Sequence, residues 1–318
     1  MGTTLPIDGI IPVMLTPFTA ANEIDYRSLG KLIEWYINNG ADTLFAVCQS
    51  SEMQKLTRRE RVDVSRFVVE QVAGRVPVIA SGHISDDADE QYAELSEVGA
   101  TGVDGIVLVT NRLDPHRKGG RTFLDDLDRL LARLPKDLPL GLYECPAPYR
   151  RLLSDEELLY CANTGRFVVL KDVSCDLATV AHRVELVKGT PLRIVNANAA
   201  IAYAAMKAGS RGFCGVFNNF HPDLYKWLLQ HGDEDQDLAD ELAIFLALAA
   251  MAEPMGYPKL AKQYQQRLGI FESDHTRVIE GDIRERFWAI DALVDHIDAG
   301  TARFRERIAA RAAARKAA

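Results

Sequence analysis

The chain contains, at residues 167–173, the apolar run FVVLKDV. A short continuous apolar run of this kind is typical of a strand that is buried on both faces of a parallel sheet. The run ends near Lys171, and burying an ammonium group is costly unless the amine is neutral or paired. This stretch therefore predicts a parallel α/β fold with an unusual lysine at the end of one strand.

Similar apolar segments recur along the chain and alternate with amphipathic helical patterns. The eight candidate strands are residues 9–17, 43–48, 77–82, 105–110, 140–145, 167–173, 193–198 and 212–217. The helical patterns between them cover 26–39, 57–74, 86–98, 120–134, 154–163, 176–187, 199–208 and 222–230. Two helix starts, Thr57 with Glu60 and Ser154 with Glu157, fit a capping box.

Eight strand-then-helix units predict an α/β fold of the (β/α)8 TIM-barrel type over residues 1–230, which would carry the active site. A doubly wound sheet is the competing fold, but no glycine-rich phosphate turn follows the first strand. From residue 231 the strand pattern stops, and helices are expected at 235–253, 258–267, 282–298 and 302–316. We expect residues 231–318 to form a C-terminal helical extension that packs on the barrel.

Composition narrows the function classes. The 318 residues are 47% hydrophobic and 26% charged, as in ordinary globular proteins, and the net charge of −8 without a basic face argues against a nucleic-acid partner. No apolar run reaches the ~20 residues of a membrane span, so no membrane partner is expected. The five cysteines are odd in number, widely spaced and free of CxxC pairs, which disfavours disulfides and favours a cytoplasmic location.

Chemistry in a TIM barrel is found at the C-terminal ends of the strands. Lys171 and Tyr143 end adjacent candidate strands there, at matching depth. An amine attacks a ketone only when it is unprotonated, and burial lowers the pKa of a lysine from about 10.4 toward neutrality. A neighbouring phenol can then shuttle protons during Schiff-base chemistry. The alternative is structural: a lysine that extends its amine to solvent and a half-buried, hydrogen-bonded tyrosine.

Other strand ends supply candidate substrate contacts. Gln49 and Ser50 lie in a small polar turn whose amides could hold a carboxylate. Cys214 lies near the end of the last strand and is a further candidate to line the site, although the favoured explanation is a small buried side chain rather than a nucleophile or ligand. For a second substrate the candidates are Arg112, Asn196 and Asn198, together with His83 and Asn218, each of which could instead be a loop or capping residue.

Metal-dependent chemistry would require several histidines or carboxylates at the barrel mouth. Of the seven histidines only His83 is placed there, and we expect the other six, His221 among them, at the surface. The sequence therefore predicts no metal site.

Five motifs, taken in their order, resemble the dihydrodipicolinate synthase / N-acetylneuraminate lyase family of class I aldolases, over roughly residues 7–270. The opening strand with Leu15-Thr16-Pro17-Phe18 is similar to the first strand of the family. The turn Cys48-Gln49-Ser50-Ser51-Glu52 stands where the family has Gly-Thr-Thr-Gly-Glu. The remaining motifs are Leu142-Tyr143-Glu144-Cys145-Pro146, Val169-Leu170-Lys171-Asp172 and Tyr257-Pro258-Lys259, which resemble the tyrosine segment, the lysine segment and the start of a later helix.

The resemblance implies that a pyruvate-type 2-oxo acid binds as an imine to Lys171, with no other cofactor. Tyr143 would be the acid/base, and the amides of Gln49 and Ser50 would hold the carboxylate. The partners would be a small 2-oxo acid, an aldehyde and further copies of the chain, because the family is commonly tetrameric; we expect a homo-oligomer, either a dimer or a tetramer.

Several positions depart from the family pattern. Gln49 replaces the first motif threonine, Leu113 replaces a tyrosine that crosses a subunit contact, and Asn196-Ala197-Asn198 replaces a Gly-Asp-Asp-like turn. An arginine that would hold the carboxylate of the second substrate is replaced by Pro148, with Arg150 nearby. These changes argue for a divergent member rather than a genuine dihydrodipicolinate synthase, and the loss of the crossing tyrosine weakens the expectation of a tetramer.

Three functional hypotheses remain open. The leading one is a Schiff-base lyase that forms or cleaves a C–C bond between pyruvate and an aldehyde, with sugar-derived 2-oxo acids as candidate substrates. The second keeps the imine but eliminates water, as in a 2-keto-3-deoxy sugar acid dehydratase. The third is a non-catalytic barrel that binds a ligand.

Overall fold

The computed structural model describes residues 6–317, and its centre is a sheet of eight parallel strands. In the sheet the strands follow the order β1-β8-β7-β6-β5-β4-β3-β2. They are β1 (Gly9–Ile10), β2 (Leu44–Phe45), β3 (Val78–Ala80), β4 (Gly105–Val109), β5 (Leu140–Tyr143), β6 (Phe167–Asp172), β7 (Arg193–Asn196) and β8 (Gly212–Phe213).

The ring closes between β2 and the segment that follows β1. Val13 and Phe45 form a parallel bridge, in which the Phe45 N–H donates to the Pro12 carbonyl and the Met14 N–H to the Phe45 carbonyl, each at 3.1 Å. Where β1 and β8 pair, an added Cβ at Gly212 would lie 1.9 Å from the Gly9 carbonyl oxygen, so this close approach requires glycine. The predicted (β/α)8 barrel is confirmed.

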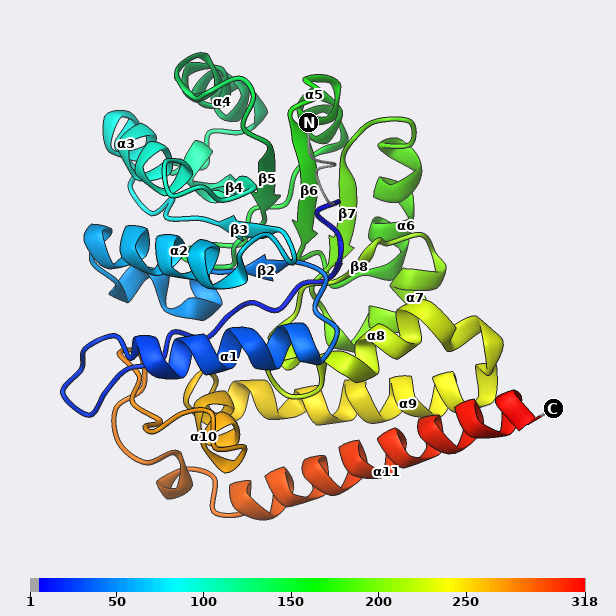
Figure 1. Cartoon of the computed structure of the whole chain (residues 1–318). Coiled ribbons are helices and arrows are strands. Elements are labelled where there is room, and N and C mark those ends of the chain that lie inside the picture. The colour runs from blue at the N-terminus through cyan, green and yellow to red at the C-terminus, as the bar shows by residue number, and fades with distance from the viewer. Residues whose placement is uncertain (1–5, 318) are drawn as a thin grey trace.

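Helices surround the ring of strands on its outer side, so that the strands lie at the centre of the barrel (Figure 1). The first eight follow the strands in turn: α1 (Tyr26–Asn38), α2 (Arg58–Val72), α3 (Ala88–Gly99), α4 (Gly120–Arg133), α5 (Asp155–Asn163), α6 (Leu177–Leu186), α7 (Ala202–Lys207) and α8 (Pro222–His231). Both predicted capping boxes are present: Thr57 and Ser154 accept from the amides of Glu60 and Glu157, whose side chains accept in return.

The C-terminal region consists of α9 (Gln236–Ala249), α10 (Lys259–Arg267) and α11 (Ile290–Ala317), of which α9 and α11 run side by side along one flank of the barrel (Figure 1). Where two helices were expected at 282–298 and 302–316, the structure has a short 3-10 turn, Ile283–Glu285, and then one continuous helix. The expected gap, 299–301, contains Gly300, but this glycine allows close packing within the continuous helix: an added Cβ would lie 2.3 Å from Phe245 of α9. That expectation was wrong.

The strands are shorter than predicted, most of all the first, expected at 9–17. Pro12 and Pro17 have no N–H to donate, so regular pairing cannot continue along this segment. The core nevertheless follows the apolar pattern, because Ile10, Val13, Phe45 and Leu170 are at most 1% exposed. Among residues 6–317 there is no helix long and apolar enough to cross a membrane.

Candidate active site

Lys171 and Tyr143 lie side by side on paired strands. In the parallel register of β5 and β6, Tyr143 is directly opposite Lys171. Lys171 is 6% exposed and Tyr143 is 3% exposed. The Lys171 Nζ lies 4.3 Å from the centroid of the Tyr143 ring. No carboxylate in the described part of the chain forms an ion pair with Lys171. The lysine is therefore a buried amine whose nearest polar neighbour in register is a phenol.

The next residue on each strand faces the opposite way, because side chains alternate along a strand. Glu144 and Asp172 are fully buried on the helix side of the sheet, and Arg183 of α6 binds both. Arg183 donates to the two Glu144 carboxylate oxygens at 2.9 and 2.8 Å, to Asp172, and to the Leu153 carbonyl at 3.1 Å. One guanidinium thus holds together the ends of the two strands that carry Tyr143 and Lys171.

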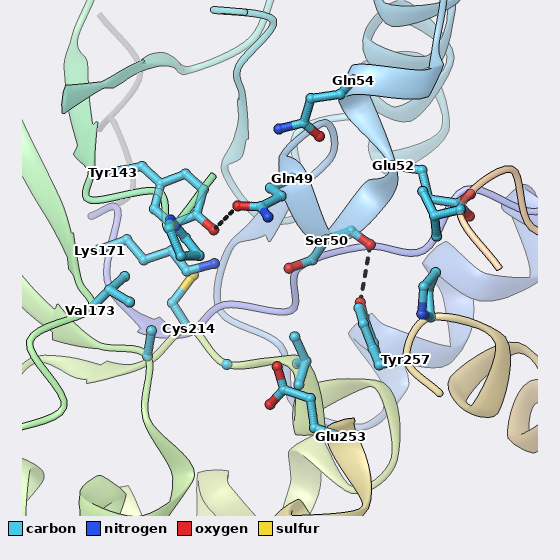
Figure 2. Close-up of a pocket in the computed structure, with 16 residues that line it drawn as sticks. Gln49, Ser50, Glu52, Gln54, Tyr143, Lys171, Val173, Cys214, Glu253 and Tyr257 are labelled. Carbon is cyan, nitrogen blue, oxygen red and sulfur yellow. Dashed lines mark hydrogen bonds between the residues drawn. The ribbon is translucent and has the colours of Figure 1, made fainter. Parts of the chain in front are cut away.

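A cavity of about 350 Å³ opens beside this pair. Figure 2 shows Tyr143, Lys171 and Cys214 on one side of it and Tyr257 on the other, with Gln49 and Ser50 between them. The rest of the wall comes from strand ends, from the loop after β2 and from the segment before α10. The lining residues are Gln49, Ser50, Glu52, Gln54, Tyr143, Pro146, Lys171, Val173, Ala197, Cys214, Gly215, Val216, Glu253, Tyr257, Pro258 and Val278.

The turn after β2 is a short 3-10 helix, Gln49–Ser51, which projects Gln49 toward Tyr143. The Gln49 Oε1 accepts from the Cys145 thiol at 2.6 Å and from the Tyr143 hydroxyl at 3.5 Å. The Ser50 carbonyl accepts from the Tyr257 hydroxyl at 3.2 Å (Figure 2). These contacts fix the turn from both sides of the cavity.

Glu52 ends this turn in the left-handed region, with φ of 64°, and is anchored by three donors from the C-terminal region. It accepts from the Lys262 ammonium at 2.5 Å, the Thr276 hydroxyl at 2.8 Å and the Arg277 N–H at 2.7 Å. Lys262 and Glu52 are 0% and 2% exposed as side chains, and burial lowers the pKa of Lys262 to about 8 even though Glu52 opposes the shift. The C-terminal helices therefore help to set the geometry of the cavity wall.

Burial decides the protonation of the groups around Lys171. Burial raises the pKa of Tyr143 well above its usual value, and the nearby thiols of Cys145, Cys48 and Cys214 raise it further. Burial also raises the pKa of Cys214 to about 12, although the charge of Lys171 lowers it. At neutral pH the tyrosine is a neutral phenol and Cys214 a neutral thiol, so the phenol can donate a proton.

The structure brings together five of the eight side chains predicted for the site. Lys171, Tyr143, Gln49, Ser50 and Cys214 all line the cavity.

The other three, Arg112, Asn196 and Asn198, do not line it. Arg112 lies in the 3-10 turn Thr110–Leu113 and pairs with Asp86 at 2.7 Å. Asn196 is buried and exchanges hydrogen bonds with the backbone of Asn198, whose own side chain caps the turn Ala199–Ile201.

His83 and Asn218, the weaker candidates, are also outside the lining and are fully buried. The His83 Nδ1 accepts from the Val109 N–H at 3.0 Å. The expectation that His221 lies at the surface was wrong: it is 0% exposed, among aromatic rings between α8 and the C-terminal helices. Among residues 6–317, no group of three or more His, Cys, Asp or Glu side chains is placed to hold a metal ion.

Several lining residues were not predicted for the site, among them Glu253, Tyr257 and Gln54. Glu253 and Tyr257 come from the segment after α9, which has no strand pattern to point to the barrel mouth. Tyr257 was noted only as the start of a helix motif. Its pKa is raised well above the usual value by burial, so its hydroxyl is neutral and available as a donor.

A barrel with a buried lysine and tyrosine at the mouth defines a class of lysine-dependent enzymes, and comparison with known proteins gives the family. The Dihydrodipicolinate synthetase family profile matches residues 6–278, and the chain belongs to this family. Its members are class I, Schiff-base-forming pyruvate aldolases, and therefore carbon–carbon lyases, that act as oligomers.

The individual relatives are distant. A 4-hydroxy-tetrahydrodipicolinate synthase from Gluconacetobacter diazotrophicus is 26% identical over 257 residues, which cover 80% of this chain and 84% of that protein. One from Shewanella sp. (strain W3-18-1) is 26% identical over 289 residues, covering 88% and 94%.

Two solved structures show the same fold. Dihydrodipicolinate synthase from Bacillus anthracis superposes with a TM-score of 0.82 at 21% identity, covering 92% of this chain and 99% of that one. YagE from E. coli K12, a prophage protein of the family in complex with pyruvate, has a TM-score of 0.80 at 22% identity, with the same coverage.

Proposed function

We propose that this protein is a Schiff-base lyase that forms or cleaves a C–C bond between pyruvate, or a related 2-oxo acid, and an aldehyde. The observation that carries the proposal is the pairing of Lys171 with Tyr143 on adjacent strands at the wall of an open cavity. The pyruvate complex of a structural neighbour supports the choice of 2-oxo acid. A cavity of about 350 Å³ suits a pyruvate-sized group together with a small second substrate.

The proposed reaction begins when the Lys171 amine attacks the ketone carbon and its nitrogen forms a carbinolamine. Tyr143, a neutral phenol, donates a proton to the departing hydroxyl, which leaves as water and gives the iminium. The Tyr143 phenolate takes a proton from the methyl carbon to give an enamine, and the enamine carbon attacks the aldehyde carbon while the phenol returns that proton to the aldehyde oxygen. Hydrolysis of the new iminium returns the free lysine, and the chemistry needs no metal or further cofactor.

Gln49 affects which groups can exchange a proton with Tyr143. Its carbonyl oxygen orients the Tyr143 hydroxyl, but an amide does not titrate and cannot pass a proton onward. We propose that Tyr143 exchanges its proton with the substrate or with water in the cavity. The N–H groups of Gln49 and Ser50, at the open start of their 3-10 turn, would hold the 2-oxo acid carboxylate.

The test is intact mass and peptide mapping after incubation with pyruvate and borohydride, which reduces an imine to a stable amine. We expect one adduct, on Lys171. Lys171→Ala should give none, while Lys207→Ala, which changes a lysine on α7 outside the cavity, should label as the wild type does. Tyr143→Phe should slow labelling by about 10²-fold or more. A folded protein without an adduct would favour a ligand-binding barrel, and a dehydrated 2-oxo acid as first product would favour a dehydratase.

We also propose that the protein is a cytoplasmic homo-oligomer. Support for the location comes from five free cysteines, four of them buried. Support for the assembly comes from α9 and the 3-10 helix that follows it, Ala250–Met255, where Ile244 and Leu248 of α9 and Met251 of the 3-10 helix are 62%, 67% and 63% exposed.

A further inference from the structure

Glu253 is the one acidic side chain that lines the cavity without a partner in the described part of the chain. The other acidic lining residue, Glu52, is occupied by Lys262, Thr276 and Arg277. No salt bridge or side-chain hydrogen bond holds the Glu253 carboxylate, whose segment is fixed instead by backbone bonds from Gly256 and Tyr257 to its carbonyl, at 3.2 and 3.0 Å. Figure 2 places Glu253 across the cavity from Gln49 and Gln54.

Within the described part of the chain, the cavity lining has no basic side chain besides Lys171 that could bind an anionic second substrate. Among residues 6–317, Lys171 is the only basic residue in the lining, and in the proposed reaction the positive charge of its iminium is opposed by the carboxylate of the 2-oxo acid bonded to it. Two basic residues next to lining residues are paired with carboxylates: Arg277, beside Val278, pairs with Glu60, and Lys259, beside Pro258, pairs with Asp274. Arg150 donates to the carbonyls of Val173, a lining residue, and Ser174, but its own side chain is not part of the lining. A substrate carboxylate in this half of the cavity would meet the Glu253 carboxylate, and among residues 6–317 the lining has no second basic side chain to pair with it.

The uncharged polar side chains of the same wall could form hydrogen bonds with the hydroxyl groups of a substrate. The Gln54 side chain has no hydrogen-bond partner among residues 6–317, and the Gln49 amide nitrogen is likewise without an acceptor. A carboxylate together with primary amides offers both acceptors and donors, as a hydroxyl requires.

We propose that Glu253 is a specificity-determining residue that restricts the second substrate to an uncharged, hydroxyl-bearing aldehyde and rejects an anionic one. The inference rests on the proposed imine at Lys171. The Coulomb repulsion between Glu253 and a substrate carboxylate several ångströms away discriminates by about tenfold at the effective dielectric constant of a protein surface. Polar pairing with the substrate hydroxyls adds selectivity against aldehydes without them.

The first experiment uses imine trapping alone, so that no second substrate need be known. The full-length protein is incubated with borohydride and either 2-oxopentanoate, which has a neutral tail, or 2-oxoglutarate, whose tail ends in a carboxylate. We expect the wild type to trap the neutral compound about tenfold faster, and Glu253→Gln to reduce this ratio toward one. Glu280→Gln is the matched control, because Glu280 is exposed on a nearby loop and lies outside the lining of this cavity.

The outcomes separate the two proposals. If the wild type traps pyruvate but Glu253→Gln leaves the ratio unchanged, the specificity role is overturned and the lyase proposal stands. If pyruvate is not trapped at all, both fall together. A second measurement compares D-glyceraldehyde with propionaldehyde in condensation with pyruvate. We expect the wild type to prefer glyceraldehyde in kcat/KM and Glu253→Ala to lose most of that preference, and an equal preference in both proteins would refute the hydroxyl-binding role.

Discussion

Replacing Arg183 with methionine should destabilise the protein strongly, and more at neutral pH than at acid pH. The guanidinium is 4% exposed and binds two carboxylates, Glu144 and Asp172, that are both 0% exposed. Removing one member of a buried ion-paired group leaves uncompensated charge, which costs about 3–5 kcal/mol. Methionine fills much of the same volume, so the loss reports on charge more than on a cavity.

The pH dependence follows from the remaining carboxylates. Burial already raises the pKa of Glu144, and Arg183 is the main group that opposes this shift. Without Arg183 the folded-state pKa of Glu144 rises further above its unfolded value of about 4, so the folded protein binds more protons than the unfolded one above that pH. The loss of unfolding free energy is therefore full at neutral pH and shrinks as the pH falls through the raised pKa of Glu144.

The assay is urea unfolding followed by circular dichroism at pH 7.5 and pH 5.5. The matched control is Arg121→Met, because Arg121 is 88% exposed and pairs only with Asp125, so its loss should change the unfolding free energy by less than about 0.5 kcal/mol. If Arg183→Met loses less than about 1 kcal/mol of unfolding free energy at pH 7.5, the reasoning is refuted. If that loss is larger at pH 5.5 than at pH 7.5, the electrostatic part of the reasoning is refuted.

Three further expectations concern other parts of the molecule. Lys262→Met should cost about 3 kcal/mol in unfolding free energy by leaving Glu52 buried and unpaired, and should weaken pyruvate labelling because the Gln49–Ser51 turn loosens; unchanged stability would contradict the first part. Burial lowers the pKa of His83 to about 4 and of His221 to about 3. The unfolded chain therefore binds more protons below pH 6.5, and stability should fall by roughly 2 kcal/mol for each histidine by pH 5. His221→Phe should show a shallower acid slope, and a slope equal to that of the wild type would argue against this origin. Finally, Leu248→Glu on α9 should shift the light-scattering mass toward the monomer, whereas an unchanged mass would place the subunit contact elsewhere.

The barrel could be predicted from sequence because its repeating unit is local. Each strand is a short apolar run, and each helix carries its own amphipathic pattern and, at Thr57 and Ser154, its own capping box. Strand lengths could not be predicted in the same way, because regular pairing depends on the neighbouring strand and on backbone donors that Pro12 lacks. Two helices were expected where α11 runs without a break through Gly300, a residue type that often follows a helix end but that here leaves room for Phe245.

The residues of the site also fall into those that could be predicted from the sequence and those that could not. Lys171 and Tyr143 follow from strand register, which the sequence pattern contains. Arg112 was a reasonable candidate by position, but a 3-10 turn directs its side chain to Asp86, and turns of this kind leave little trace in apolar periodicity. Glu253 reaches the cavity only because the C-terminal helices pack against the barrel, a tertiary event that local spacing does not encode.

Arg183 binds Glu144 and Asp172 and so forms a clamp on the two strand ends. This clamp affects where the sequence of such a protein can change. The reactive pair is held from the helix side of the sheet, whereas the opposite wall comes from loops around Gln54 and Glu253 that take no part in the clamp. Mutations can therefore accumulate in those loops, and alter which aldehyde is accepted, without disturbing the position of the nucleophile. An engineer who wants this scaffold to form a new carbon–carbon bond should randomise the loops around Gln54 and Glu253. The helix α6 and the strand ends at Glu144 and Asp172 should be left unchanged.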